Sequence, residues 1–124
     1  MKRFSFFSAV VVLFLLAGWT FHQARPAKAD IANDRATAQT AMKNGNFKDA
    51  YDLFRAICLS EEANGRLVAG DYVNAVTCLN QLGRLTEFDD LTEQTVAAHA
   101  DDWHVLRQVA DQMLTVQHWG FRVA

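Results

Sequence analysis

Glycines that each precede an aliphatic or aromatic residue by one or two positions recur at Gly45, Gly83 and Gly120, at intervals of 38 and 37 residues. A near-constant period in this range, with one helical hairpin per period, is the sequence signature of a helical solenoid. Proline occurs only at Pro26, and no useful stretch alternates in the manner of a β-strand. The sequence therefore predicts an all-α array of about two and a half hairpins.

The first turn is the best formed and resembles the tetratricopeptide consensus. Gly45 provides the tight turn, Phe47 the aromatic residue, and Ala50 the small residue where two helices touch, with Phe54 four residues later. The later turns use Gly83, Leu85 and Phe88, and then Gly120 and Phe121. They are degenerate, because a phenylalanine occupies the position of the small residue. A generic bundle of five helices is the alternative.

Apolar spacing places the helices between these turns. The predicted helices cover residues 31–44, 47–58, 68–82, 86–98 and 102–116. Asn46, Thr86 and Asp102 are the predicted N-caps, since Asn, Thr and Asp side chains accept hydrogen bonds from the first turn of a helix. The motif "GDYVNA" at Gly70 copies the first turn, but it follows too closely for a full hairpin and is interpreted as the start of the third helix. The last helix is expected to bury Trp103, Leu106, Val109, Ala110, Met113 and Val116.

The N-terminal segment has the three parts of a secretory signal. Lys2 and Arg3 precede an apolar run, and small residues surround Lys28. Residues 1–29 are therefore predicted to be a signal peptide cleaved between Ala29 and Asp30, and residues 30–124 a helical repeat domain. A retained inner-membrane anchor at residues 4–21 is the alternative.

Charge and cysteine content limit the function classes. From Asp30 onward, 8 Lys and Arg residues face 14 Asp and Glu residues, a net charge of −6. This acidity argues against nucleic acid and anionic membrane surfaces as partners, so membrane contact is expected only through an uncleaved signal segment. In an oxidising compartment, Cys58 and Cys78 either pair as a disulfide or are both small buried hydrophobes, because spacing alone does not decide between these.

No residue pattern points to catalysis, a cofactor or a metal ion. The spacing of His99 and His104 around Asp101 and Asp102 matches no zinc motif, and a solvated loop with a helix N-cap is expected there. The acidic residues Glu87, Asp89, Asp90 and Glu93 are interpreted as a solvated face at a helix start. A partner groove is instead expected near Gln39, Met42, Asn74, Asn80 and Gln81, because the first helix of each hairpin lines the hollow of an array.

Three stretches, "MKNGNFKDAYDLFR", "NAVTCLNQLGRLTEFDD" and "HWGFRVA", resemble the helical N-terminal region of exported bacterial α-2-macroglobulin-like proteins. The resemblance covers residues 41–124 and implies a protease-trapping parent with β-sandwich domains, a bait segment and often a thioester. Neither cysteine is in the Cys-Gly-Glu-Gln sequence of that thioester. The resemblance thus implies a non-catalytic scaffold that binds a protein or peptide; a stand-alone exported adaptor is the alternative.

The third hairpin is incomplete in the sequence, since three residues follow Phe121. Solenoids normally end in a polar capping helix. The chain is accordingly predicted to be the front piece of a longer protein or a truncated copy, and to self-associate through this unfinished end.

Overall fold

The computed structural model describes residues 28–116, which form five α-helices, one 3₁₀ turn and no strand. The elements are α1 (Lys28–Lys43), α2 (Phe47–Cys58), α3 (Gly65–Gln81), η1 (Leu85–Glu87), α4 (Phe88–Ala98) and α5 (Trp103–Thr115). The all-α prediction is confirmed for this part of the chain. The apolar run of the signal peptide and the turn at Gly120 and Phe121 lie outside the described residues, and cleavage before Asp30 stays a prediction.

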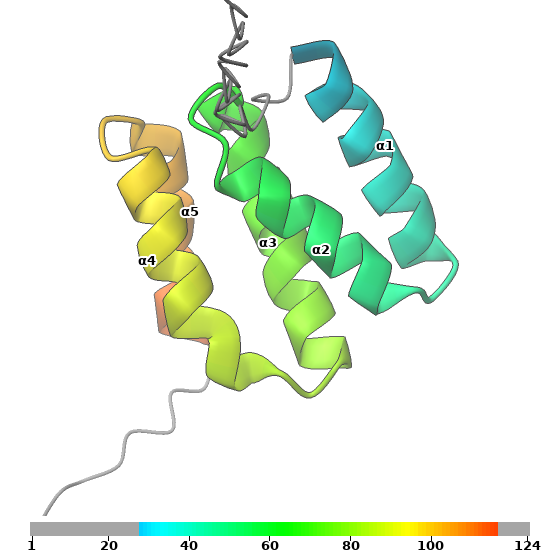
Figure 1. Cartoon of the computed structure of the whole chain (residues 1–124). Coiled ribbons are helices and arrows are strands. Elements are labelled where there is room, and N and C mark those ends of the chain that lie inside the picture. The colour runs from blue at the N-terminus through cyan, green and yellow to red at the C-terminus, as the bar shows by residue number, and fades with distance from the viewer. Residues whose placement is uncertain (1–27, 117–124) are drawn as a thin grey trace, which may run out of the picture.

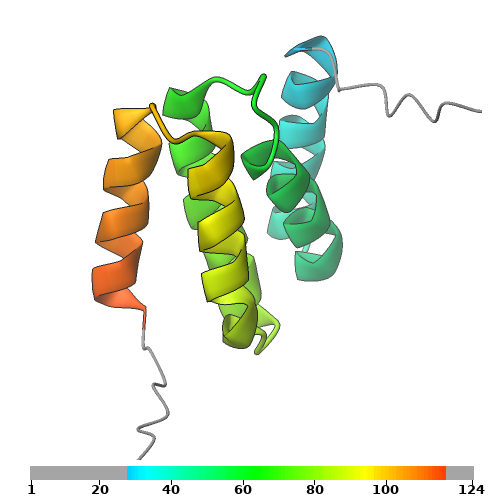
Figure 2. The ribbon, with the colours of Figure 1, turned by 60° about the vertical axis from the view of Figure 1, so that its left-hand side comes forward.

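The helices are arranged as successive antiparallel hairpins. α1 pairs with α2, α3 is followed by the antiparallel α4, and α5 packs chiefly against α3 (Figure 1). In a second view α1 and α5 lie at opposite ends of the row, with α3 and α4 between them (Figure 2). Two complete hairpins and the first helix of a third are therefore present in the described residues, and the predicted hairpin array is confirmed.

The first two repeat turns have the same backbone structure. Gly45 and Gly83 have φ values of +80° and +66°, in the left-handed region that only glycine adopts without strain. In the first turn the amide of Gly45 donates to Met42 O (3.1 Å) and that of Asn46 to Ala41 O (2.9 Å). The equivalent bonds join Gly83 to Asn80 (3.1 Å) and Arg84 to Leu79 (2.9 Å). Both are Schellman motifs, which explains why glycine recurs with this period.

Of the predicted N-caps, Asn46 is correct in position but lacks the capping hydrogen bond, and Thr86 is wrong. Asn46 precedes α2, but its side chain makes no capping hydrogen bond, because the Schellman turn holds its ψ at 63° rather than in the extended region of a typical cap. Thr86 lies inside η1, so its own backbone is already helical and cannot cap α4. In the second hairpin, the 3₁₀ turn η1 therefore leads directly into α4. Phe88, at the position of Ala50 in the first hairpin, is buried where this turn ends.

The third helix begins earlier than expected. Asn64 caps it, with its side-chain oxygen accepting from the Arg66 amide at 3.1 Å, and α3 then runs through Gly70 without interruption. The interpretation of Gly70 as a helix start is therefore wrong. A glycine inside a helix costs only about 1 kcal/mol relative to alanine, and the packing of Val68 and Tyr72 on either side outweighs this cost.

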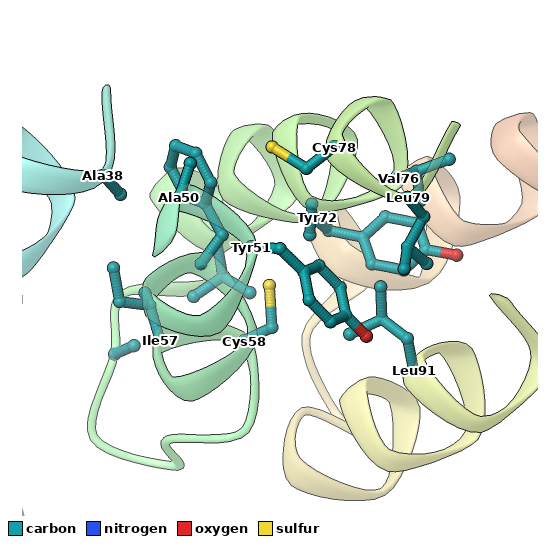
Figure 3. Close-up of a cluster of buried hydrophobic side chains, with 14 of the residues drawn as sticks. Ala38, Ala50, Tyr51, Ile57, Cys58, Tyr72, Val76, Cys78, Leu79 and Leu91 are labelled. Carbon is teal, nitrogen blue, oxygen red and sulfur yellow. The ribbon is translucent and has the colours of Figure 1, made fainter. Parts of the chain in front are cut away.

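Large apolar side chains from α2, α3 and α4 form most of the core, and Figure 3 labels several of them, including Ile57, Tyr72 and Leu91. One buried polar chain crosses this core. The Thr92 hydroxyl donates to the Phe88 carbonyl at 2.7 Å, so the Tyr72 hydroxyl, 2.7 Å from Thr92 Oγ1, is the donor to it. This chain satisfies both hydroxyls and ties α3 to α4.

An ion pair joins the first hairpin to the second. Arg35 Nε on α1 donates to both carboxylate oxygens of Asp71 on α3, at 2.9 and 2.8 Å. Arg35 Nη2 lies 2.7 Å from Oδ2 without forming a further hydrogen bond. The side chains are 15% and 3% exposed. Because Asp71 is almost completely buried, α1 must stay in place to neutralise it.

The two cysteines are buried free thiols on different helices, Cys58 on α2 and Cys78 on α3 (Figure 3). The structure therefore does not pair them, and they pack as small hydrophobes. Burial raises the pKa of each thiol above its ordinary value of 9.0.

The last helix presents a different face to the core from the predicted one. Val105 and Val109 are buried, whereas Trp103 is 61% and Met113 48% exposed. The prediction was correct for Val109, and Val116 is partly buried against the core, but it was wrong for Trp103, Leu106, Ala110 and Met113, which are exposed. α5 carries apolar residues on two sides, and the side bearing Val105 and Val109 is the one turned to the core.

Between residues 28 and 116, no helix is both long and apolar enough to cross a membrane. The predicted alternative anchor at residues 4–21 lies outside this range.

Candidate protein-interaction groove

A groove of about 310 Å³ lies between α3 and α5, the first helices of successive hairpins. We call it the α3–α5 groove. Its walls are Val76, Thr77 and Asn80 from α3, Leu85 from η1, and Gln112, Thr115 and Val116 from the end of α5. Residues three and four apart share one helix face, so each helix presents its groove residues together. The groove is thus a direct product of hairpin stacking.

Amide side chains supply the hydrogen-bonding capacity of the α3–α5 groove. Among the described residues, the side chains of Asn80 and Gln112 have no hydrogen-bond partner. Each side-chain amide offers two N–H donors and an acceptor oxygen, and can therefore bind both the carbonyl and the N–H of a peptide unit. The Thr77 hydroxyl instead donates to Val73 O at 2.9 Å, within its own helix. The two amides are therefore the groups best able to bind a peptide backbone here.

The sequence predicted five groove residues, and the structure brings one of them, Asn80, into this groove. Gln39 and Gln81 are exposed elsewhere, and Met42 packs against the core. Asn74 is half-buried and does not line the α3–α5 groove.

Sequence reasoning missed Gln112 and Thr115, although the repeat period contains the signal for both. They follow Asn74 and Thr77 by 38 residues, the interval between the first two turn glycines. Extending the register of the third helix to the fifth would therefore have identified them.

A second, open cavity of about 630 Å³ lies at the turn between α4 and α5. His99, at its edge, is buried, and its Nε2 lies 3.1 Å from Cys58 O. A carbonyl only accepts, so Nε2–H is the donor, and it satisfies the end of α2. The expectation of a solvated loop is therefore wrong for His99.

The predicted cap at Asp102 is confirmed. Its carboxylate accepts from the His104 amide at 2.9 Å and lies 3.1 Å from His104 Nδ1. Gly65 leaves room for this carboxylate, because a Cβ atom at that position would collide with it. Asp102 thus caps the start of α5 and lies directly against the start of α3.

The two histidines in this region serve different neighbours. His99 contacts the end of α2, whereas His104 contacts Asp102 and stacks on Trp103 with ring centroids 3.7 Å apart. In the described part of the chain, no three His, Cys, Asp or Glu side chains are grouped so that they could hold a metal ion.

Two of the acidic residues around α4 form ion pairs. Glu87 binds Arg84 through two hydrogen bonds of 2.6 and 2.8 Å, and the Arg84 guanidinium also lies 5.1 Å from the ring centroid of Tyr51. Asp90 lies 3.6 Å from Arg55 of α2. The prediction of a solvated face is therefore incomplete, because these acids also link α4 and η1 to the first hairpin.

No protein-family model, curated protein or solved structure matches this chain.

Proposed function

We propose that this chain is a non-catalytic helical scaffold that binds an extended segment of a partner protein in the α3–α5 groove. The observation that carries this proposal is the pair of amides, Asn80 on α3 and Gln112 on α5, which line one groove together with apolar side chains. An extended segment presents backbone donors and acceptors along its length, and such amides bind them without requiring a particular charge. Val76 and Leu85 provide apolar contact for its side chains.

The wider context of this scaffold is proposed from the sequence. The resemblance of residues 41–124 to the helical region of exported bacterial α-2-macroglobulin-like proteins favours a scaffold within a protease-inhibitor type of protein. A stand-alone exported adaptor is the alternative. A reading frame that continues past Ala124 into β-rich sequence would support the first, and an authentic stop codon with a monodisperse soluble product would support the second.

Selection of binders from a displayed random-peptide library tests the groove directly. The full chain serves as bait, and selected peptides are measured by isothermal titration. Replacing both Asn80 and Gln112 by leucine removes two amides at nearly constant volume and is expected to weaken binding at least about tenfold, from roughly 1 kcal/mol per lost hydrogen bond.

The matched control is Gln39→Leu, which removes an exposed amide from α1, away from the groove. This variant should bind the selected peptides as the unmodified chain does. Equal losses in the control and in the double variant, or no loss in either, would refute the groove as the binding site.

A further inference from the structure

The outward side of α5 carries a row of exposed apolar side chains. Trp103, Leu106 and Leu114 are 61%, 37% and 85% exposed, and Ala110 lies between them on the same arc of the helix. We call these four residues the α5 outer row. From Trp103 to Leu114 the row extends about 16 Å along the helix axis. Exposed large apolar side chains gathered in one row mark an interface in a soluble protein.

Two opposite charges run along one edge of this row. Arg107 and Asp111 are both exposed, and neither forms an ion pair with any residue of the described part of the chain. They lie two residues before and two residues after Val109. In an antiparallel copy of α5 related by a two-fold axis at the level of Val109, Arg107 of each chain therefore lies level with Asp111 of the other.

The same axis also fits the apolar residues together. Trp103 lies six residues before Val109 and Leu114 five residues after it, so the two side chains from opposite copies differ in level by about 1.5 Å. Leu106 lies three residues before Val109 and Ala110 one residue after it, so Leu106 of one chain lies within about 3 Å of the level of Ala110 of the other. Because Ala110 is small and close to the axis, it allows the two helices to approach each other. One register thus satisfies both the charges and the apolar side chains.

We propose that the α5 outer row is a self-association surface, on which a second copy of this chain pairs its own α5 in antiparallel orientation. This surface is distinct from the α3–α5 groove. Gln112 follows Trp103 by nine residues, which at about 100° per residue places it on the opposite side of the helix. The dimer therefore leaves the groove open.

The proposed dimer is weak because each chain contributes one helix face. Stable complexes bury about 800 Å² per partner, and a contact of one helix with another is smaller. Association is therefore expected only at high protein concentration, with a dissociation constant weaker than about 1 μM.

Cross-linking of the full chain tests the geometry. Ala110→Cys places a thiol near the two-fold axis, and mild oxidation should link two chains through it. Ala56→Cys, on an exposed position of α2, is the control, and the natural cysteines are buried and do not compete. The rate of dimer formation should be at least about tenfold higher for Ala110→Cys than for Ala56→Cys. Adding Leu106→Glu should abolish this difference, because dimerisation would then bury an unpaired carboxylate in the interface.

Charge reversal tests the register of the two α5 helices. Association through the apolar residues 4–21 would not depend on these charges, so the test distinguishes the two. On the Ala110→Cys background, Arg107→Glu alone and Asp111→Arg alone each place like charges together and should suppress cross-linking. An equal mixture of these two variants should restore it, because every pair in the mixed dimer is then of opposite sign.

Three results would overturn the proposal. One is an equal cross-linking rate for Ala110→Cys and Ala56→Cys. Another is a failure of the mixture to exceed the separate charge variants. The third is a thiol at position 110 that reacts only after residues 117–124 have been removed, since the chain's own terminal segment would then be the occupant.

Discussion

Replacing Asp71 by alanine is expected to reduce the free energy of unfolding by about 3–5 kcal/mol, because it leaves the Arg35 guanidinium without its counter-charge between α1 and α3. The expected loss is large because Asp71 and Arg35 side chains are only 3% and 15% exposed, and water can replace the carboxylate poorly. A domain of this size has a total stability of only about 5–15 kcal/mol, so the variant should be close to unfolding.

Removing both partners should be far less harmful. A chain with Arg35→Met and Asp71→Leu fills the site with apolar side chains of similar volume and leaves no buried charge, so its stability should lie within about 1 kcal/mol of the original or above it. Urea denaturation followed by circular dichroism measures these free energies, and an unchanged denaturant slope shows that the unfolding reaction is the same.

The exposed pair of Lys48 and Asp52 provides the control. Its N–O distance is 2.9 Å, close to that of the buried pair, but the side chains are 70% and 55% exposed. Asp52→Ala should therefore leave the urea midpoint almost unchanged. A loss below about 1 kcal/mol for Asp71→Ala, or an equal loss in the single and double variants, would contradict the reasoning from burial.

Three further predictions concern the turns, the start of α5 and the buried thiol. Gly45→Ala should destabilise the chain by about 1–2 kcal/mol because of its positive φ, whereas Gly70→Ala, inside a helix with open space, should stabilise it by about 0.5–1 kcal/mol; thermal unfolding compares them. Gly65→Ala should displace the Asp102 carboxylate and cost about 1 kcal/mol, seen as faster amide exchange in the first turn of α5. Above pH 9 the native state keeps the proton of Cys58 that the unfolded state releases, so stability should fall by up to about 1.4 kcal/mol per pH unit for this thiol, and Cys58→Ala should reduce that slope in urea titrations.

The turns of the array could be predicted from the sequence because their requirement is local. A helix that ends with a residue in the left-handed backbone conformation favours glycine there. The positions of Gly45 and Gly83 therefore predict both the turns and the repeat period. Asp102 was also predictable, since a short acidic side chain before an apolar helix start caps it directly. Asn46 shows the limit of this rule, because the preceding turn had already fixed its backbone.

The face of α5 could not be predicted because its apolar residues fit two helical arcs. Val105 and Val109 lie on one arc, and Trp103 and Leu106 on the other. The helical period describes both equally well, and only the position of α3 decides which arc enters the core. The row predicted from the sequence combined Val109 of the buried arc with the larger side chains of Trp103 and Leu106, and these larger side chains are the exposed ones.

The polar contacts between hairpins could not be predicted from local sequence patterns either. Arg35 and Asp71 are separated by 36 residues, and His99 and Cys58 by 41. No pattern of spacing distinguishes these residues from ordinary surface arginines or loop histidines. The candidate groove was partly predictable, since Asn80 was identified from its helix and the 38-residue period relates Gln112 to Asn74. Only the packing of α5 on α3 shows that Gln112 lines the groove and Asn74 does not.

The most direct measurement of the central claim is an NMR titration of the full chain with a peptide selected by display. If the α3–α5 groove is the binding site, the largest shifts of amide signals should fall on Val76, Asn80, Gln112 and Thr115, including the side-chain amides of Asn80 and Gln112. Shifts concentrated instead on the cavity beside His99 and Asp101, with the groove signals unmoved, would contradict it.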